Sequence, residues 1–310
     1  MNLPAITVSG LTKTYGPVTA LDGITLEVAR GSVLAVLGHN GAGKTTLVGI
    51  LSTRIHPDSG TARVCGYDVV HDGAAVRRRI GVTGQSASVD EALSGRANLV
   101  LIARLLGASA AQARRRAAEL LAAFDLGQLA ERPARTYSGG LRRRLDLAMS
   151  LVGAPDVVFL DEPTTGLDPV SRAALWSALE DLAGRGTTIV LTTQYLEEAD
   201  RLADQVVVLG LGQVTVSGTP ARLKAQLGER MATLTFGTDL VLRRGVSALN
   251  RLGVHAEVDG LALKLPLAGR ADLPVIVRAL DTAGAPLRDL IVTEPTLDDV
   301  YLSLHRKAAS

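Results

Sequence analysis

One short stretch, residues 38–45, constrains the fold of this chain more than any other part of it. Its sequence, Gly-His-Asn-Gly-Ala-Gly-Lys-Thr, fits the phosphate-binding pattern G-x-x-x-x-G-K-[ST]. Residues 32–37, before it, form an apolar run of strand type, and residues 46–51, after it, predict the first turns of a helix. Between a strand and a helix N-terminus, free backbone N–H groups and the helix dipole both point at an anion. These flanks favour a phosphate-binding loop in an α/β fold over a glycine-rich turn that contains a lysine by chance.

The residues of this loop differ in what they offer to a phosphate group. Gly41 and Gly43 permit backbone angles and a close approach that a Cβ atom would block. Lys44 would reach the β- and γ-phosphates, and the Thr45 hydroxyl would ligate Mg²⁺. The nucleotide-binding residues that we expect here are Gly38, Asn40, Gly41, Ala42, Gly43, Lys44, Thr45 and Thr46.

The length and charge of the chain limit the classes of protein to consider. Its 310 residues suffice for one large domain and a smaller one. A formal net charge of +2 gives no support to a nucleic-acid-binding protein, which carries a concentrated basic face, so we expect no nucleic-acid partner. The single cysteine, Cys65, excludes an internal disulfide and a cysteine-based zinc cluster, and it fits a reducing cytosol.

The sequence also predicts that the chain does not enter a membrane by itself. No apolar run approaches the length that is needed to cross a bilayer. The first residues have neither a basic region nor an apolar region of the kind that a signal peptide needs. Any role at a membrane would therefore need a membrane-embedded partner.

Asp161 and Glu162 end an apolar run that begins at Val157 and predicts a central parallel strand buried on both faces. Ligands in open α/β sheets lie at the carboxyl ends of such strands. Two adjacent carboxylates would be costly to bury there without a cation. A site for Mg²⁺ and phosphate removes that cost: Asp161 would hold the ion, and Glu162 could orient or deprotonate a water molecule.

Two further features are ambiguous when taken from the residues alone. Ser138 is a good helix N-cap, and Gly139 and Gly140 after it would leave N–H groups exposed to an anion. An ordinary glycine-rich helix start is at least as good an interpretation. Tyr15 is either a packing residue at the end of a hairpin or a flat face on which a nucleobase stacks.

The pattern of strands and helices predicts two domains, residues 1–228 and residues 229–310. Within the first, apolar residues recur at helical spacing, which predicts an inserted helical subdomain of about 87–152 in an otherwise α/β chain. The second is predicted to be a small α+β domain with the order β-α-β-β-α-β, the split-βαβ arrangement. It has no cluster of catalytic residue types, so its default interpretation is a structural or partner-binding module.

Together and in this order, these segments resemble the nucleotide-binding subunit of ABC transporters over roughly the first 225 residues. In that resemblance residues 38–45 are Walker A, residues 157–161 are Walker B, and Ser138, Gly139 and Gly140 are the family signature. The resemblance implies a P-loop NTPase cassette that binds ATP with Mg²⁺ and hydrolyses it. It implies adenine stacking by Tyr15, contact with Mg²⁺ and the attacking water by Gln85, Mg²⁺ ligation by Asp161, a catalytic base in Glu162 and a D-loop aspartate in Asp168.

The resemblance also implies how the chain would assemble. A family cassette works as a head-to-tail dimer, with each ATP between Walker A of one copy and the signature of the other. Ser138 would then serve the nucleotide of a second copy. ATP supplies charge that both faces need, so it closes the dimer, and hydrolysis reopens it. The implied location is the cytoplasmic side of the cell membrane, docked on a separate integral membrane permease.

Three residues depart from the family pattern. Leu141 replaces the usual glutamine after the signature, and His39 replaces a common proline in the phosphate loop. Gln194 stands where most members have the switch histidine. A glutamine can hydrogen-bond to the γ-phosphate but cannot become cationic there. We therefore expect this catalytic position to affect the rate of hydrolysis more than the binding of ATP.

Four phrases, at residues 89–96, 137–146, 192–200 and 294–301, look like the daunorubicin/doxorubicin-resistance type of ATP-binding protein. Members of that group drive antibiotic export through a separate permease, and this is the function we expect. A cassette that exports another cargo (lipid, polysaccharide, ion or peptide) is the alternative, because the permease chooses the cargo. A DNA-repair or ribosome-associated ATPase is less favoured, because those proteins usually carry two cassettes, a long coiled-coil insertion or zinc-binding cysteines.

Overall fold

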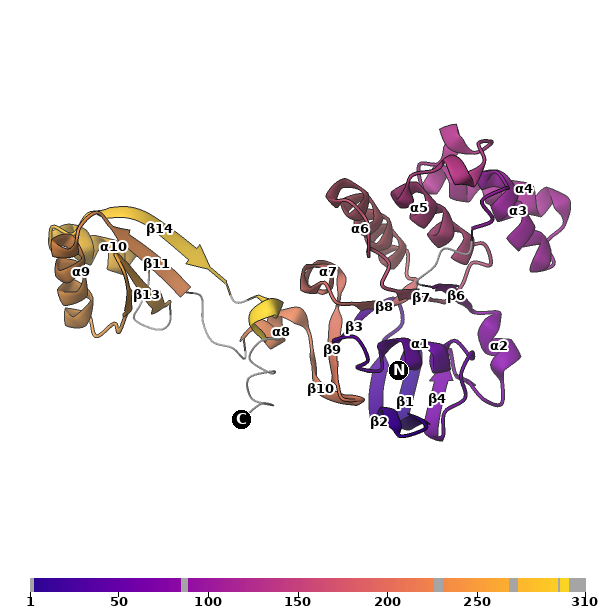
Figure 1. The fold of residues 1–310 in the computed structure, drawn as a ribbon, viewed down its shortest axis with the longest axis horizontal. Helices are drawn as coiled ribbons and strands as arrows, with labels where there is room; N and C mark the ends of the chain where they lie inside the picture. Colours follow the sequence, from indigo (N-terminus) through magenta and orange to yellow (C-terminus); the bar gives the residue numbers. More distant parts are fainter. Residues whose placement is uncertain (1–2, 85–88, 226–230, 268–272, 295, 301–310) are drawn as a thin grey trace. The chain divides into compact units, whose positions relative to one another are not determined.

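The computed structural model of this chain describes residues 3–84, 89–225, 231–267, 273–294 and 296–300. Two compact units make up the chain, Met1–Pro220 and Ala221–Ser310 (Figure 1). The predicted boundary between residues 228 and 229 lies outside the described residues. No described helix combines the length and the apolar character that a bilayer crossing requires.

The larger unit is built on a mostly parallel sheet. Its strands are β3 (Val33–Leu37), β6 (Ile80–Thr83), β7 (Val157–Asp161), β8 (Thr188–Thr193), β9 (Gln205–Gly210) and β10 (Gln213–Gly218), in the order β10-β9-β3-β8-β7-β6. All neighbours pair in parallel except β10, which pairs antiparallel with β9. β3, β7 and β8 are buried along their whole length, which explains the apolar sequence of β3, of β7 up to Asp161 and of the middle of β8.

The parallel register sets the ends of three central strands side by side. Leu37 at the end of β3 pairs with Thr193 of β8, and Asp161 at the end of β7 pairs with Thr192 of the same strand. β8 therefore separates the strand that leads into the phosphate loop from the strand that ends in the two carboxylates. This one edge of the sheet collects the residues that the sequence predicts for nucleotide chemistry.

A second sheet packs against the helix that follows the phosphate loop. Its strands are β1 (Ile6–Tyr15), β2 (Val18–Val28), β4 (Ser59–Val64) and β5 (Tyr67–Asp68), in the antiparallel order β2-β1-β4-β5. Helix α1 (Lys44–Leu51) shares one apolar core with strands of both sheets. Helix α2 (Gly73–Arg77) follows β5. Packing on both sides explains why α1 buries most of its residues, although it is only 8 residues long.

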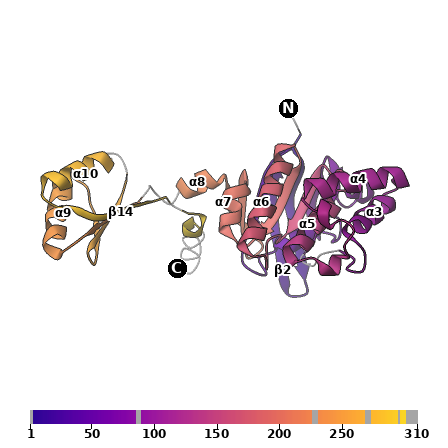
Figure 2. The ribbon, with the colours of Figure 1, turned by 90° about the horizontal axis from the view of Figure 1, so that it is seen from above.

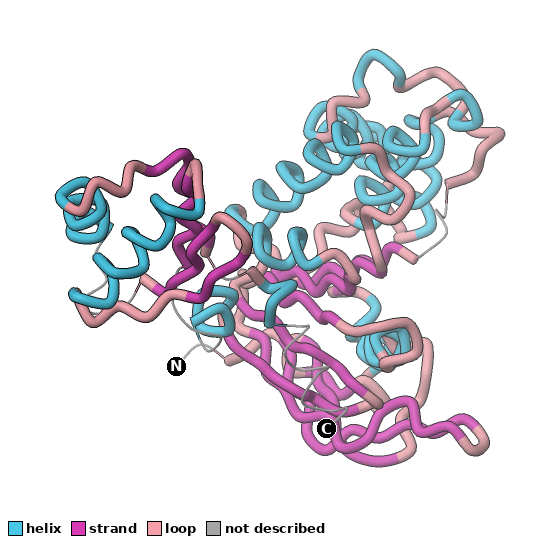
Figure 3. Tube along the Cα trace, turned by 60° about the vertical axis from the view of Figure 1, so that its left-hand side comes forward, coloured by secondary structure: helices cyan, strands magenta, loops and turns pink. Residues whose placement is uncertain are grey.

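The inserted helical subdomain contains α3 (Gly95–Leu105), α4 (Ala110–Ala123) and α5 (Gly139–Ser150). Figure 3, in which helices are cyan, shows these helices gathered apart from the strands of the cassette. Helix α6 (Pro169–Gly184) comes after β7 and lies beside α5 (Figure 2). Helix α7 (Leu196–Leu202) follows β8. The insertion therefore contacts the cassette through α5, which packs against α6 and β6.

The smaller unit begins within α8 (Pro220–Ala225), at Ala221, and then has its own sheet and core. Its elements are β11 (Met231–Phe236), α9 (Asp239–Arg251), β12 (Glu257–Asp259), β13 (Ala262–Pro266), α10 (Leu273–Thr282) and β14 (Leu287–Thr293). The antiparallel sheet has the order β12-β13-β11-β14, and α9 and α10 pack together over a separate apolar core. This is the predicted β-α-β-β-α-β order, and the predicted fold class of the whole chain is confirmed.

Candidate nucleotide-binding site

The loop between β3 and α1 has a conformation that depends on its glycines. Gly41 and Gly43 have φ values of 84° and 104°, in the left-handed region that favours glycine. At Gly43 an added Cβ would also lie 2.4 Å from the carbonyl oxygen of Ala20. Since α1 starts at Lys44, directly after Gly43, its first backbone N–H groups have no partner within the helix and can bind an anion.

Lys44 is buried beside this loop although it carries a charge. Its Nζ donates hydrogen bonds to the carbonyl oxygens of Gly38, at 2.7 Å, and His39, at 3.3 Å. The same nitrogen lies 3.6 Å from the carboxylate of Glu162. All three partners are oxygen acceptors that phosphate oxygens can replace, and a charged donor to a phosphate makes a stronger hydrogen bond than a neutral one. The geometry supports the predicted contact between Lys44 and a nucleotide phosphate.

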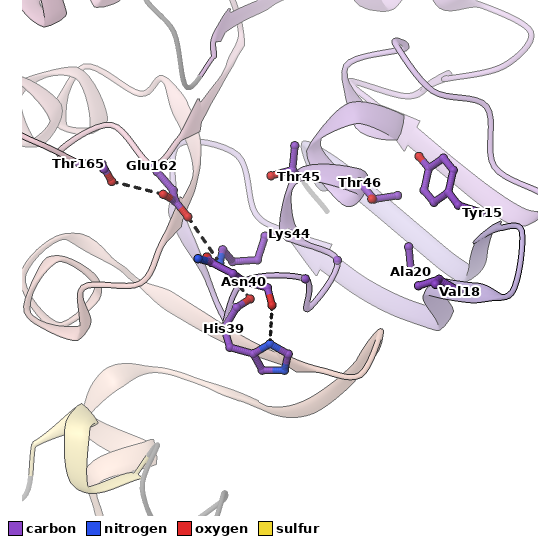
Figure 4. Close-up of a pocket in the computed structure, with 12 residues that line it drawn as sticks. Tyr15, Val18, Ala20, His39, Asn40, Lys44, Thr45, Thr46, Glu162 and Thr165 are labelled. Atoms are coloured by element: carbon purple, nitrogen blue, oxygen red, sulfur yellow. Dashed lines mark hydrogen bonds and ion pairs between the residues drawn. The ribbon is translucent and has the colours of Figure 1, made fainter.

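Asp161 and Glu162 are neighbours in sequence but have different surroundings. Asp161 is only 2% exposed and accepts hydrogen bonds from the Thr192 hydroxyl, at 2.5 Å, and the Thr45 hydroxyl, at 3.3 Å. Glu162 has a φ of 48°, held by hydrogen bonds from its backbone N–H to the carbonyl and hydroxyl oxygens of Thr192. This left-handed conformation turns the Glu162 side chain toward Lys44 (Figure 4). One carboxylate is thus enclosed by hydroxyls, and the other faces the cavity, where it lies beside Lys44 and accepts a hydrogen bond from the Thr165 hydroxyl at 3.3 Å.

The oxygen atoms at the end of β7 fit a magnesium ion that arrives with a nucleotide. Among the described residues, no group of three or more His, Cys, Asp or Glu side chains is placed to hold a metal. Mg²⁺ is usually held by one or two carboxylates together with phosphate oxygens and water, rather than by a cage of protein ligands. The Asp161 carboxylate and the Thr45 hydroxyl lie 3.3 Å apart, and both can serve as oxygen ligands of a metal ion, which matches that requirement.

A cavity of about 590 Å³ opens beside the phosphate loop (Figure 4). Its lining residues are Tyr15, Val18, Ala20, His39, Asn40, Gly41, Gly43, Lys44, Thr45, Thr46, Glu162 and Thr165. Figure 4 shows Tyr15, Val18 and Ala20 at one end and Glu162 at the other, with Lys44 between them. The Tyr15 side chain is 47% exposed, and the Lys13 Nζ lies 5.5 Å from its ring centroid. An apolar, aromatic end and a charged end suit the base and the phosphates of one nucleotide.

Several predicted site residues do not line this cavity. Gln194 is exposed in the turn between β8 and α7, and Asp168 is exposed at the start of α6. Ser138 and Gly139 are exposed at the start of α5. Gln85 lies outside the described residues. The roles of these residues therefore stay predictions, and the second phosphate-binding helix start does not complete the cavity of the same copy.

The start of α5 and Asp168 are joined through a residue that the sequence did not single out. The Ser138 hydroxyl accepts a hydrogen bond from the Leu141 N–H at 3.3 Å, which confirms Ser138 as the N-cap of α5. An added Cβ at Gly140 would lie 2.3 Å from the Ser171 hydroxyl. Ser171 in turn donates from its N–H and hydroxyl to Asp168, at 2.9 and 2.6 Å. These two hydrogen bonds, the hydroxyl's first, hold the pKa of Asp168 below its usual value.

Thr192 is the second contact residue that sequence reasoning missed. Its hydroxyl donates to Asp161, and its backbone and hydroxyl oxygens both accept from the N–H of Glu162. The only sequence signal was its place at the end of an apolar strand. Its importance depends on β8 being the neighbour of β7, which the sequence by itself did not reveal.

Known proteins with similar sequences include ATP-binding proteins of ABC transporters and of drug resistance. The family model described as ABC transporter matches residues 21–165. A daunorubicin resistance ATP-binding protein of Streptomyces coeruleorubidus is 50% identical over 301 residues, which are 97% of this chain and 95% of that protein. A daunorubicin/doxorubicin resistance ATP-binding protein of Streptomyces peucetius is 46% identical over 303 residues, 97% of this chain and 92% of that protein. A Nod factor export ATP-binding protein I of Ralstonia nicotianae is 37% identical over 302 residues, 97% of this chain and 94% of that protein.

Solved structures agree with the fold of the larger unit. An ATP-binding subunit of an ABC transporter superposes with a TM-score of 0.64 and 28% identity, over 72% of this chain and 92% of that chain. The phosphate loop, the helix that begins at Gly139 and the buried strand that ends at Asp161 follow one another in the order read from the sequence. Identity at this level over almost the whole length shows that the chain belongs to the family of ATP-binding subunits of ABC transporters, and it is an ATPase of that family.

Proposed function

We propose that this subunit powers the export of a drug or antibiotic through a separate integral membrane permease, from the cytoplasmic side of the cell membrane. The observation that carries the proposal is the 50% identity to a daunorubicin resistance ATP-binding protein over 97% of this chain. This match includes most of the smaller unit as well as the ATPase cassette, so it concerns more than the nucleotide chemistry that all cassettes share.

Within one copy, each end of the cavity would perform a separate task. Tyr15 would stack on the adenine, and Lys44 would neutralise charge on the β- and γ-phosphates. Thr45 and Asp161 would hold Mg²⁺, which when bound offsets the charge of the phosphate oxygens. Glu162 would orient the attacking water and accept its proton, since its carboxylate faces the cavity beside Lys44.

The other half of the working site would come from a second copy of this chain. Ser138 and Gly139 are exposed and do not line the cavity of their own copy, which supports a role toward another nucleotide. Asp168 lies at the same surface through its hydrogen bonds to Ser171, beside Gly140. The proposed assembly is the head-to-tail dimer, in which ATP contacts Lys44 of one copy and the signature of the other. Gln85 and Gln194 would contact Mg²⁺, water or the γ-phosphate in that closed state.

The substitution Glu162→Gln tests this assignment. It keeps the shape of the side chain and removes the base, so ATP turnover should fall by about a hundredfold or more while ATP affinity stays near that of the wild type. An ATP-bound dimer should then persist on size exclusion. The control is Glu27→Gln on β2, which changes an exposed glutamate that does not line the cavity. Unchanged ATPase activity in Glu162→Gln would contradict the assignment of Glu162.

The cargo needs a separate experiment, because relatives with different exports share this fold. The Nod factor export relative, at 37% identity, shows that another cargo is the alternative. The chain should be expressed with its permease in a drug-sensitive host, with the Glu162→Gln variant as the matched control. Growth in daunorubicin that depends on ATP turnover supports drug export. Co-purification with a permease but no gain of resistance would favour the alternative cargo.

A further inference from the structure

A buried arginine outside the cavity joins the signature helix to the strand that carries the two carboxylates. Arg143 lies on α5 and is 9% exposed. Its Nε donates to the carbonyl oxygen of Pro163 at 2.8 Å, and its Nη1 donates to that of Gly84 at 2.7 Å. Its Nη2 donates to the carbonyl oxygen of Asp161 at 3.2 Å. One side chain thus binds three backbone carbonyls from two separate segments.

Those carbonyls flank the residues that are assigned to chemistry. Asp161 and Pro163 lie on either side of Glu162, and Gly84 directly precedes Gln85. Arg143 itself follows Gly140 by three residues, so it lies within the first turns of the helix that the signature begins. A movement of the start of α5 would therefore act on the backbone around Glu162 through this side chain.

The surroundings of Arg143 are charged as well as buried. Its Nη1 lies 3.2 Å from the carboxylate of Asp146, which is itself 3% exposed. Burial lowers the pKa of the Arg143 guanidinium, and the negative charge of Asp146 opposes part of that shift. A buried ion pair of this kind is often no more stabilising than apolar residues of the same volume. Stability alone is therefore a weak reason for an arginine at this position.

The geometry of the contacts favours arginine over any other cation. A guanidinium is planar and presents five N–H donors in fixed directions, whereas a lysine ammonium is a single charge on a flexible stem. The three carbonyl contacts use three different nitrogens of Arg143. A lysine could keep a charge near Asp146 but could not hold all three carbonyls in this arrangement.

We propose that Arg143 is a positioning residue for ATP hydrolysis, which fixes the backbone on both sides of Glu162 relative to the signature helix α5. The proposal rests on the role assigned to Glu162 above. In the proposed dimer, the signature of this chain binds the nucleotide whose phosphates lie on the second copy. Glu162 acts on the other nucleotide, which is held by the phosphate loop of its own copy. Arg143 would then link the two nucleotide sites, because binding at the start of α5 would set the orientation of Glu162.

The first test is Arg143→Lys in the full-length protein. We expect the ATP dissociation constant and KM to stay within about twofold of the wild type, because Arg143 does not line the cavity. We expect kcat to fall about tenfold to a hundredfold, the size of effect that a small misplacement of a catalytic group produces. Wild-type kcat in Arg143→Lys would overturn the proposal.

The matched control is Arg116→Lys. Arg116 lies on α4 and donates to the carbonyl oxygens of Leu151, at 2.7 Å, and Val152, at 3.3 Å, just beyond the other end of α5. Its loss removes a similar set of arginine–carbonyl bonds from the helical subdomain and touches no strand end. We expect kcat in this variant within about twofold of the wild type. An equal loss of kcat in both variants would show a general effect of stability and would overturn the proposal.

A second variant separates positioning from charge neutralisation. The double substitution Arg143→Met with Asp146→Leu removes both buried charges, and it should lower the melting temperature, because three backbone carbonyls lose their hydrogen-bond donor. Its kcat should stay as low as that of Arg143→Lys, each protein being assayed well below its own melting temperature. Recovery of wild-type kcat would show that Arg143 only neutralises Asp146, and the proposal would fail.

The outcome also separates this inference from the proposed catalytic role of Glu162. An inactive Glu162→Gln variant with a fully active Arg143→Lys variant would refute the positioning role alone. A fully active Glu162→Gln variant would refute the catalytic role of Glu162 and the positioning role that rests on it.

Discussion

Single residues at the end of β7 show how adjacent carboxylates acquire different environments. Asp161 remains on the strand and is enclosed by the hydroxyls of Thr45 and Thr192. Glu162 leaves the strand with a positive φ, and its carboxylate lies within 3.6 Å of Lys44. A left-handed conformation costs roughly 1 kcal/mol or more for a residue with a Cβ, and such conformations cluster at functional sites. The structure therefore supports separate tasks for the two side chains.

Gln194 is a residue whose effect can be measured directly. In the single copy its side chain is exposed and does not line the cavity. In the proposed function it would therefore contact a nucleotide only in the closed dimer. Gln194→His should leave kcat equal or higher, with any gain largest below about pH 6.5, where an imidazole becomes cationic. Steady-state ATPase assays across pH measure this, with Gln194→Ala as the control that removes the hydrogen-bonding group. Complete loss of activity in Gln194→His would show that glutamine itself is required.

At the scale of elements, the order of the strands decides what the two carboxylates contact. β8 lies between β3 and β7, so Thr192 and Thr193 lie between the phosphate loop and the end of β7. Helix α5 reaches the same edge from the inserted subdomain through Arg143. The site is thus the meeting point of a loop, two strand ends and one helix from the insertion.

Helix α7 contributes a second buried carboxylate close to this edge. Glu197 is exposed in its first turn, but Glu198 is fully buried and accepts a hydrogen bond from the Trp176 indole at 3.1 Å. Burial raises the pKa of Glu198 above its ordinary value of 4.5, although the Thr193 hydroxyl and the Trp176 indole oppose part of the shift. Because α7 packs on β8 and α6, the buried Glu198 carboxyl holds its proton more tightly than a carboxyl exposed to water.

This shift predicts a dependence of stability on pH. Well below pH 4.5, Glu198 is protonated in both the folded and the unfolded state. As the pH rises above 4.5, Glu198 ionises first in the unfolded state. The folded state therefore loses stability until the pH exceeds the raised pKa of Glu198. The free energy of unfolding of the wild type, relative to Glu198→Gln, should therefore fall as the pH rises above 4.5. Urea unfolding of both proteins measures it, with Glu197→Gln as the exposed control. A difference that does not change with pH would contradict the prediction.

At the scale of the whole molecule, the described residues of each unit form an apolar core of their own. The cassette buries one apolar cluster around α1, and the smaller unit buries another around β11, α9 and α10. The described residues of the smaller unit do not line the nucleotide cavity. We propose that this unit contacts the second copy or the permease.

Removal of residues 221–310 tests that proposal. Because the cassette has its own core and cavity, the truncated protein should keep ATP affinity within about twofold of the wild type. It should lose ATP-dependent dimerisation or permease-dependent drug resistance, measured by size exclusion and by growth in drug. The full-length Glu162→Gln variant is the control for a loss caused by absent hydrolysis. Normal ATPase activity, dimerisation and resistance in the truncated protein would refute a role for this unit in contacts.

Much of this protein was determined by short stretches of sequence alone. The phosphate loop, the N-cap at Ser138 and the buried strand before Asp161 are local features, because the residues that define each of them are contiguous. Backbone freedom at Gly43, hydrogen bonding at a helix start and an apolar run do not depend on the rest of the fold. These features, in their order, were enough to predict the fold class and the family.

Only the tertiary structure decided which distant residues support that site. Thr192 reaches Asp161 across 31 positions of sequence, and Arg143 reaches Gly84 across 59. The burial of Glu198 likewise follows from the packing of Trp176 and its helix, and nothing in its own segment distinguishes it from Glu197. Such contacts depend on strand order and helix placement, which many non-local interactions set together. The sequence alone therefore predicted the phosphate loop, whereas the tertiary structure determined which distant residues contact the end of β7.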